Sequence, residues 1–444
     1  MKILVLGLGL NGGGRAAAMY FARNRKNEVR ISDIAPREKF GVGIDELEKL
    51  GIRCIFEDTD PRENIRWADI VIKNPAIPQN LPHLSIAKAI SNDFAFLFNS
   101  EDVKRMKVIC VTGTKGKTTT VAAIHHALSE LGKRSIYCGN IGVSAFSVLE
   151  EIERRKRKKQ ELPQYVVCEM SSWQVHDTWM ALNGKMPSIE LAIFTSMYAD
   201  HQNSYHSISD YINDKLKLFG PHCRHILIDE KMKTFFFKNT HRIARITKLF
   251  PGYYNPYVNK QRELCCAFSA LKILGFRKKE IMKAISTYKG MPHRIEQVAT
   301  VDNIMYVNDS AATISEAVTF SLDTLFPLPV HLICGGTDKE LRANGMQRAI
   351  KKVSSVTLLD GSFTRNKLIP LLEKNGIEYS GPFSTMKEAF DTARSKAEAM
   401  RDEGGRVQVV LLSPGAASFE LFRNEFDRGD QFKALASKLV PSAK

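Results

Sequence analysis

A glycine-rich segment at residues 113–119, Gly-Thr-Lys-Gly-Lys-Thr-Thr, contains the residue types that bind the phosphates of a nucleotide. It follows an apolar stretch and precedes a helical pattern, and its glycines let backbone N–H groups turn toward phosphate oxygens. Lys117 can reach the β- and γ-phosphates, and the Thr118 hydroxyl can bind Mg²⁺. The general phosphate-loop pattern has a glycine where this chain has Val111, but the shorter spacing allows the same chemistry. We therefore predict a phosphate-binding loop formed by Gly113, Thr114, Lys115, Gly116, Lys117, Thr118 and Thr119.

Two further apolar stretches end in polar residues that could hold a cation. Glu169 directly follows the stretch 165–168, and a carboxylate at a strand end beside a phosphate loop is well placed for Mg²⁺. His201 lies shortly after the stretch 191–194 and could act as a metal ligand or a hydrogen-bond donor. Ligands of open α/β sheets gather beyond the carboxyl ends of strands, so both residues are candidates for the same site. A surface glutamate and a histidine without a function are the alternatives.

A second glycine motif lies at the start of the chain. Gly7, Gly9 and Gly12 form Gly-x-Gly-x-x-Gly after the apolar stretch 3–6, and Asp33 ends the next apolar stretch. This arrangement is the dinucleotide fingerprint, in which the start of a helix faces a pyrophosphate. The motif alone leaves the ligand open: it could be NAD, FAD or another nucleotide diphosphate such as a UDP-sugar. A turn that binds no ligand and only permits close packing is the further alternative.

Candidate binding residues also lie in the last third of the chain. Arg294 and Asp309 could clamp the phosphates and ribose of a nucleotide, or form a salt bridge between domains. The segments 335–339 and 413–418 each follow an apolar stretch and could bind an anion at a helix start. A tight turn without a ligand is the alternative for both segments.

The elements that carry these residues alternate between apolar strands, glycine-containing turns and helices. This alternation predicts α/β domains with mainly parallel sheets. The 444 residues suggest about three domains. We predict a Rossmann-like domain at 1–92, a central P-loop-type ATPase domain at 93–299 and a second Rossmann-like domain at 300–444. The predicted strands are 3–6, 29–32, 69–72, 108–111, 165–168, 191–194, 304–307, 330–333, 356–359 and 407–412, with helices ending near 22 and 131 and spanning 263–274.

Composition narrows the class of protein. Lysine and arginine number 64 against 48 aspartates and glutamates, which gives a formal net charge of +16 and suits ligands that carry phosphates. The basic run 154–159 ends a predicted helix and is expected to be a solvated loop, with nucleic-acid binding as the alternative. None of the eight cysteines forms a Cys-x-x-Cys pair, so we expect no zinc knuckle and a reducing cytoplasm. No apolar run approaches the ~20 residues that a membrane span needs.

The order of these motifs resembles the Mur ligase family over essentially the whole chain. The pattern consists of GTKGKTT, GNIG at 139–142, EMSS at 169–172, Asp200-His201, a helix lysine, HRIE at 293–296, NDS at 308–310 and GGTDK at 335–339. The resemblance implies domains that bind a UDP-linked substrate, ATP and an amino acid. It implies ATP-driven amide-bond formation in peptidoglycan precursor synthesis. The opening GLGLNG and the ending LSPGAASFELF…RGDQF resemble the members that add D-glutamate to UDP-N-acetylmuramoyl-L-alanine.

The resemblance also implies a role for individual residues. Lys117, His201 and Lys215 would be catalytic, and Lys215 matches the lysine that the family carbamylates to make a metal ligand. Thr118, Glu169, His201 and Lys215 would bind Mg²⁺, and Asn259, Arg294 and Asp309 would join the phosphate loop in contacting ATP. The UDP-linked muramoyl substrate would contact Gly9, Leu10, Asn11, Asp33, Asn74 and Asn140. The incoming amino acid would contact Lys339, Ser418 and Phe419.

Three positions depart from the family pattern. Val258 stands where the family has histidine before the asparagine that matches Asn259. Ala311 stands where the most similar members often have lysine, and Glu425 stands where many have phenylalanine. The amino acid therefore stays open, and a related ligase, such as one that extends folate with glutamate, is an alternative. An NAD-dependent dehydrogenase and a nucleic-acid-binding P-loop protein are the more distant alternatives. With the ligase we expect a cytoplasmic monomer whose partners are the UDP-linked substrate and an amino acid, without nucleic acid or membrane.

Overall fold

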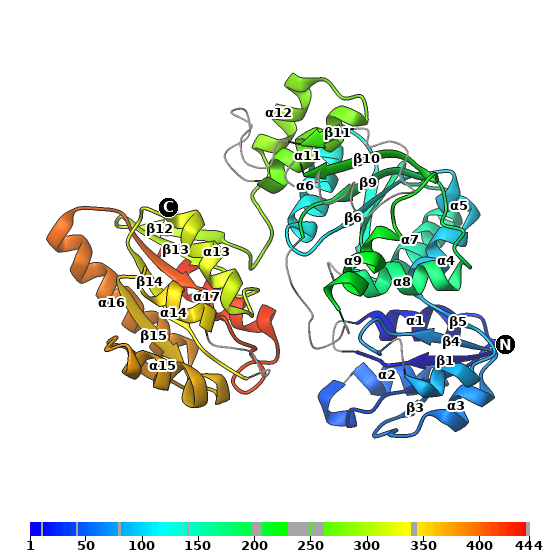
Figure 1. Cartoon of the computed structure of the whole chain (residues 1–444), viewed down its shortest axis with the longest axis horizontal. Coiled ribbons are helices and arrows are strands. Elements are labelled where there is room, and N and C mark those ends of the chain that lie inside the picture. Colours follow the sequence, from blue (N-terminus) through cyan, green and yellow to red (C-terminus); the bar gives the residue numbers. More distant parts are fainter. Residues whose placement is uncertain are drawn as a thin grey trace. The chain divides into compact units, whose positions relative to one another are not determined.

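The computed structural model describes residues 1–9, 12–40, 43–78, 81–139, 142–197, 207–229, 248–250, 262–338 and 344–440. The chain folds into two compact units, residues 1–288 and 289–444. Within the described residues, the first unit contains two β-sheets and the second unit contains one (Figure 1). None of the described helices is long and apolar enough to cross a bilayer. The eight cysteines all lie in the described residues, and none forms a disulfide.

The first sheet is parallel and belongs to the predicted N-terminal domain. Its strand order is β3 (Arg53–Ile55), β2 (Glu28–Ser32), β1 (Lys2–Leu6), β4 (Ile70–Lys73) and β5 (Ile90–Ser91). Its helices are α1 (Gly13–Ala22), α2 (Gly43–Lys49) and α3 (Arg62–Trp67). Side chains of β1 alternate between the two faces, so Ile3 and Val5 join one buried core while Leu4 and Leu6 join another.

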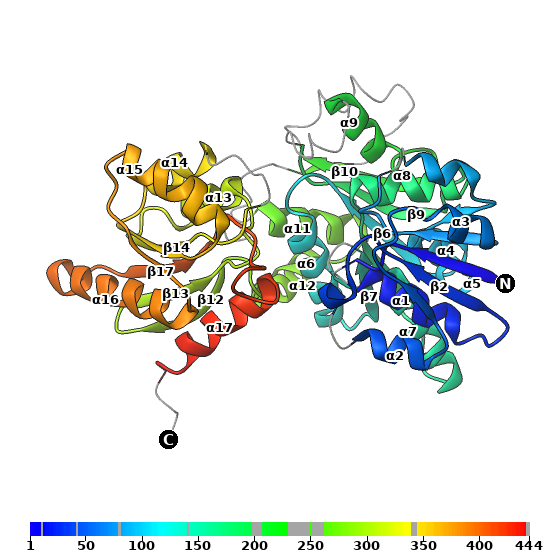
Figure 2. The same cartoon turned by 90° about the horizontal axis from the view of Figure 1, so that it is seen from below.

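The second sheet is also parallel and carries the phosphate loop. Its strand order is β11 (Lys248–Phe250), β10 (Cys223–Asp229), β9 (Ile189–Phe194), β6 (Lys107–Thr112), β8 (Tyr165–Glu169) and β7 (Ser135–Gly139). Its helices are α4 (Asp93–Asn99), α5 (Glu101–Lys104), α6 (Lys117–Glu130), α7 (Ala145–Arg157), α8 (Ser172–Ala181), α9 (Ile208–Leu216), α11 (Arg262–Ile273) and α12 (Lys278–Ser286). Helices α6 and α11 pack together, and α1 of the first sheet packs against α7 (Figure 2).

The third sheet forms the centre of the second unit. Its strand order is β12 (Glu296–Val301), β13 (Ile304–Asn308), β17 (Gln408–Leu412), β14 (Val330–Cys334), β15 (Ser355–Leu359) and β16 (Ser380–Phe383). Only the pairing of β12 with β13 is antiparallel among the described strands of this sheet. Its α-helices are α13 (Ser315–Leu325), α14 (Asn344–Ile350), α15 (Ile369–Lys374), α16 (Met386–Gly404) and α17 (Glu425–Ser437).

Each predicted strand is present in the structure, and no end shifts by more than two residues. Strands such as β7, β10 and β16 were not predicted from the sequence. The basic run ends a helix as predicted, but only residues 158–159 lie beyond it, because residues 154–157 form the last turn of α7. Basic side chains are favourable there, since the helix dipole places partial negative charge at that end. The third sheet begins at Glu296, ahead of the predicted domain start at residue 300, and the three-domain division stays a prediction.

Candidate active site

The predicted phosphate loop lies between a buried strand and a helix. Strand β6 ends at Thr112, and helix α6 begins at Lys117. Gly113 has a φ of 143° and Gly116 a φ of 81°, backbone conformations that glycine adopts far more readily than other residues. A Cβ atom at Gly113 would collide with the Thr195 hydroxyl, so the loop also needs glycine for space.

Two polar residues after β9 hold this loop in place. The Thr114 N–H donates to the Ser196 carbonyl at 2.8 Å, and the Lys115 N–H donates to Ser196 Oγ at 2.8 Å. The Thr195 and Ser196 hydroxyls donate to the Lys115 carbonyl at 2.6 and 2.9 Å. The sequence analysis did not identify Thr195 or Ser196 as site residues. Their position directly after a predicted strand could have indicated them.

Two lysines converge on the loop. Lys117 Nζ donates to the carbonyls of Gly113 and Thr114 at 3.0 and 2.9 Å. Lys215 Nζ, from α9, donates to the same Gly113 carbonyl at 3.1 Å and lies 4.4 Å from the centroid of the Tyr211 ring. Lys215 is only 2% exposed, although it is distant from the loop in sequence. The structure therefore brings together two of the three predicted catalytic residues.

Glu169 is a buried carboxylate at the end of β8. It is 1% exposed, and its Oε2 atom has no hydrogen-bond partner among the described residues. A buried carboxylate without a partner is costly, so this oxygen fits a bound cation. No group of three or more His, Cys, Asp or Glu side chains in the described residues is arranged to hold a metal. The predicted ligand His201 lies outside the described residues.

Asp33 contacts the N-terminal glycine loop directly. Its Oδ2 accepts the N–H groups of Leu8 at 2.7 Å and Gly9 at 3.4 Å, and its Oδ1 accepts the Ala35 N–H at 2.9 Å. Asp33 therefore fixes the backbone of the loop that the sequence predicts to face a nucleotide. Asn74 packs so closely that a Cβ atom at Gly9 would lie 2.6 Å from Asn74 Nδ2. The other predicted substrate contacts lie outside the described residues, namely Leu10, Asn11 and Asn140.

Asp309 is buried at the end of β13 in the second unit. Its carboxylate accepts hydrogen bonds from the Ser321 hydroxyl at 2.5 Å, the Ser413 hydroxyl at 2.8 Å and the Ile295 N–H at 3.2 Å. Burial raises the pKa of Asp309 to about 6, although these hydrogen bonds and nearby Arg294 oppose the rise.

Arg294 stands on a strained turn beside Asp309. Its neighbours His293 and Ile295 have φ values of 62° and 46°, a conformation that is costly for a β-branched residue. The side chain of Arg294 is exposed, as a phosphate contact requires. The predicted ATP contact Asn259 lies outside the described residues.

Replacing Asp309 with asparagine is expected to change how stability depends on pH. Between about pH 4 and pH 6 the native carboxyl holds a proton that the unfolded chain has released. The contribution of this carboxyl to the free energy of unfolding therefore falls by about 3 kcal/mol as the pH rises through this interval and is level above it. In Asp309→Asn this fall should be absent. The free energies of unfolding of the parent and the variant are measured by urea denaturation at several pH values, and hydrogen exchange in peptides from 304–334 reports on the local effect. If the difference between the two free energies does not change with pH, the prediction is contradicted.

The loops after β14 and β17 lie side by side. Thr337 and Ala417 form an antiparallel bridge, with N–H to carbonyl distances of 3.0 and 3.2 Å. The predicted amino-acid contact Ser418 is 3% exposed, whereas Phe419 is 46% exposed. The third predicted contact, Lys339, lies outside the described residues.

Arg428 connects two of the predicted binding segments, and sequence analysis did not identify it. It is completely buried in α17, and burial lowers its pKa to about 10. Its guanidinium donates to the Ser310 hydroxyl and carbonyl, each at 2.9 Å, and to the carbonyls of Ala416 and Ala417 at 3.1 and 3.2 Å. The planar guanidinium reaches both segments at once, which a lysine could not do.

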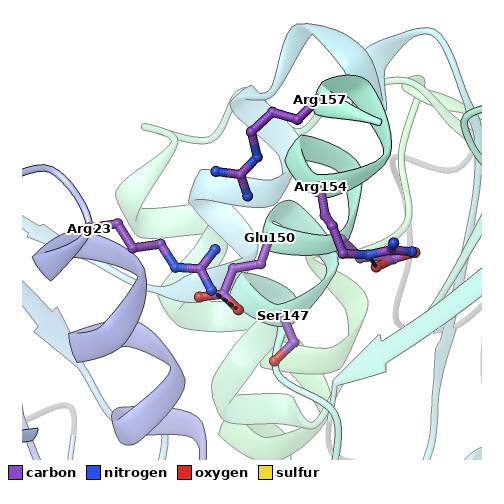
Figure 3. A pocket seen from close by; sticks show the side chains of 6 residues that line it. Arg23, Ser147, Glu150, Arg154 and Arg157 are labelled. Carbon is purple, nitrogen blue, oxygen red and sulfur yellow. Dashed lines mark hydrogen bonds and ion pairs between the residues drawn. The ribbon is translucent and has the colours of Figure 1, made fainter. Parts of the chain in front are cut away.

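Part of the basic run at the end of α7 is paired with nearby carboxylates. Arg154 and Arg155 each contact Glu151, at 2.6 and 2.7 Å, and Lys156 contacts Asp102 at 2.8 Å. A small pocket of about 180 Å³ beside this turn is lined by Arg23, Ser147, Glu150, Glu151, Arg154 and Arg157 (Figure 3). The ion pairs of Arg154, Arg155 and Lys156 reduce the charge that this turn could offer to a nucleic-acid backbone.

The loop, the two lysines and the buried carboxylate define a nucleotide-binding α/β enzyme. Residues 111–249 match the Mur ligase middle domain. The sequence is 32% identical to UDP-N-acetylmuramoylalanine--D-glutamate ligase of Borreliella afzelii (strain PKo), over 99% of this chain and 98% of the relative. The chain therefore belongs to the Mur ligase family.

Solved structures share the fold. UDP-N-acetylmuramate-alanine ligase MurC from Thermotoga maritima matches with a TM-score of 0.60 at 17% identity, over 99% of this chain and 100% of that chain. Folylpolyglutamate synthase from Mycobacterium tuberculosis, complexed with ADP and AMPPCP, matches with a TM-score of 0.52 at 12% identity, over 79% and 96% of the two chains. The predicted α/β fold, family and enzyme class, an amide-bond-forming ligase, are confirmed, and the dehydrogenase is not favoured.

Proposed function

We propose that this enzyme joins D-glutamate to UDP-N-acetylmuramoyl-L-alanine in an ATP-dependent reaction of peptidoglycan precursor synthesis. The observation that carries the proposal is the convergence of Lys117 and Lys215 on the Gly113 carbonyl, at the loop that follows β6. Buried Glu169, with an oxygen that lacks a hydrogen-bond partner, adds a cation ligand at the end of a neighbouring strand. The Borreliella relative is a UDP-N-acetylmuramoylalanine--D-glutamate ligase, which supports the choice of substrates.

ATP is the co-substrate, and the phosphate loop 113–119 would bind its phosphates through backbone N–H groups and Lys117. Thr118, Glu169, His201 and Lys215 would hold Mg²⁺, which when bound neutralises charge on the phosphates. An ammonium group does not bind a cation, so Lys215 would act as a ligand only after carbamylation. In the second unit, Arg294 and Asp309 would contact the nucleotide, and Asn259 of the first unit would contact its base.

The reaction would begin with attack of the substrate carboxylate on the γ-phosphorus, which releases ADP and forms an acyl phosphate. The amine of the amino acid then attacks the acyl carbon, and inorganic phosphate leaves from the tetrahedral intermediate. Lys117 and the loop N–H groups would stabilise the charge that develops on the transferred phosphoryl group. Phosphorylation supplies the leaving group that a free carboxylate lacks.

The two remaining substrates would occupy separate parts of the chain. Domain 1–92 would bind the UDP-linked substrate through Gly9, Leu10, Asn11, Asp33 and Asn74, together with Asn140 of domain 93–299. Domain 300–444 would bind the amino acid through Lys339, Ser418 and Phe419. A cytoplasmic monomer stays the prediction.

The proposal is tested by measuring phosphate release with Mg·ATP, UDP-N-acetylmuramoyl-L-alanine and a panel of D- and L-amino acids. We expect turnover with D-glutamate and little with L-glutamate or neutral amino acids. The panel also tests whether Ala311 and Glu425, two of the three departures from the family pattern, change the amino acid that is used. Ala311 follows Ser310 in sequence, and the Glu425 carbonyl accepts a hydrogen bond of 2.7 Å from the Ser310 hydroxyl. Turnover only with another amino acid would reassign the enzyme within the family, and no turnover with any would reject the proposal.

A further inference from the structure

Lys73, the last residue of β4, has a buried ammonium group with three close oxygen neighbours. Its Nζ donates to the Ile77 carbonyl at 2.8 Å and to the Asn74 carbonyl at 3.4 Å. It also forms an ion pair of 2.8 Å with Asp177 of α8, in which both side chains are less than one-tenth exposed. Lys73 therefore connects the turn 74–77 of the first sheet to a helix of the second sheet.

The turn that Lys73 holds is the one that packs on the N-terminal glycine loop. The Asn74 N–H donates to the Leu6 carbonyl at 2.9 Å, and the Asn74 side chain accepts the Ala76 N–H at 2.9 Å. A Cβ atom at Gly7 would lie 2.9 Å from Asn74 Cβ, so turn and loop have no room to slide past each other. Because Asn74 belongs to this turn, any group that holds the turn in place also fixes the Asn74 side chain against the glycine loop.

The other partner, Asp177, lies on a helix that leads to the central site. Helix α8 starts just after Glu169 with a capping box formed by Ser171 and Gln174. On the same helix, the Thr178 hydroxyl accepts a hydrogen bond of 2.9 Å from Asn92, which lies between the first two sheets.

The residue before Asp177 extends this connection to α9. His176 forms a hydrogen bond of 2.7 Å with Asp214, the neighbour of Lys215. Successive residues of one helix therefore contact the first sheet, the connection between the sheets, and the helix that carries Lys215.

The energetics of the pair favour a role in geometry over a role in stability. Burial raises the pKa of Asp177, with Lys73 opposing the rise, which reflects the cost of removing the carboxylate from water. A buried ion pair is often no more stabilising than apolar side chains of similar volume. Such a pair does demand one distance and one orientation, because a displaced partner leaves a buried charge uncompensated.

We propose that Lys73 and Asp177 are a positioning pair, which fixes the Asn74 turn relative to α8 and so sets the UDP-linked substrate over the phosphate loop. The inference rests on the proposed function, because it assigns that substrate to the Asn74 turn. Neither residue is proposed to touch the reacting atoms. Their effect would pass through Asn74 on one side and α8 on the other.

The test compares the parent with the double variant Lys73→Met/Asp177→Leu, which removes both charges together and keeps apolar volume. We expect a folded protein whose KM for the UDP-linked substrate rises about 10-fold and whose kcat falls about 10-fold, since small misplacements of a reacting group are costly. The KM for ATP should stay within about 2-fold, because the phosphate loop is held by Thr195 and Ser196 instead. The exposed pair Glu101–Lys104 supplies the control, and Glu101→Gln/Lys104→Met should match the parent.

Hydrogen exchange of the peptide 70–78 adds a readout that does not depend on turnover. Faster exchange at residues 74–77 in the double variant is expected. If the parent itself shows no turnover, the proposed function fails, while the exchange result still reports on the pair. A folded double variant with parental KM, kcat and exchange would overturn the inference. If the double variant is unfolded, Asp177→Asn is tested instead, because it removes the charge and keeps the shape of the side chain. Parental KM, kcat and exchange in Asp177→Asn would also overturn the inference.

Discussion

Replacing Lys117 with alanine is expected to lower ATP-dependent phosphate release by about 10³-fold while the protein stays folded. The ammonium group lies at the start of α6 and now donates to two carbonyls of its own loop. A γ-phosphate would compete with these carbonyls for the ammonium group. In Lys117→Ala the transferred phosphoryl group would lack this positive charge. The measurement is phosphate release at saturating substrates, with circular dichroism to confirm folding.

A matched control separates this role from a general effect of charge. Lys185 is exposed and follows α8, and Lys185→Ala removes the same charge away from the loop. That variant should retain parental turnover. Unchanged turnover in Lys117→Ala, or an equal loss in both variants, would remove Lys117 from the proposed mechanism.

Replacing Lys215 with alanine should reduce turnover by about 10²-fold or more, and small carboxylic acids should partly restore it. The side chain is buried between Tyr211 and the Gly113 carbonyl, so its removal leaves a space that formate or acetate can enter. If the functional form is a carbamate, an added carboxylate replaces its negative charge. The measurement is turnover of Lys215→Ala against concentration of formate, acetate and methylamine.

The choice of additive makes this prediction specific. Pivalate carries the same charge but is bulkier, so it should rescue poorly if the space is closed. Rescue by methylamine and not by formate would mean that the functional group is an ammonium ion. That outcome would reject carbamylation of Lys215 while leaving its catalytic importance intact.

Much of the fold could be predicted from local sequence. Strands β1, β6 and β8 are short apolar runs that end in glycine or polar residues, and their neighbours in sequence form the turns that follow. The phosphate loop was predictable for the same reason, since its glycines, lysine and threonines are consecutive. Strands β7 and β16 were missed because they carry partly exposed side chains and lack a continuous apolar run.

The sequence by itself determined the α/β class, the phosphate loop and the chemistry available at each strand end, because these depend on residues that are neighbours in the chain. Only the tertiary structure decided which of those residues meet. It placed Lys215 on the Gly113 carbonyl, turned Asp33 toward the glycine loop, buried Arg428 between two loops and paired Lys73 with Asp177. Each of these contacts joins segments far apart in sequence, and a buried charge takes whichever partner the packed core brings within reach.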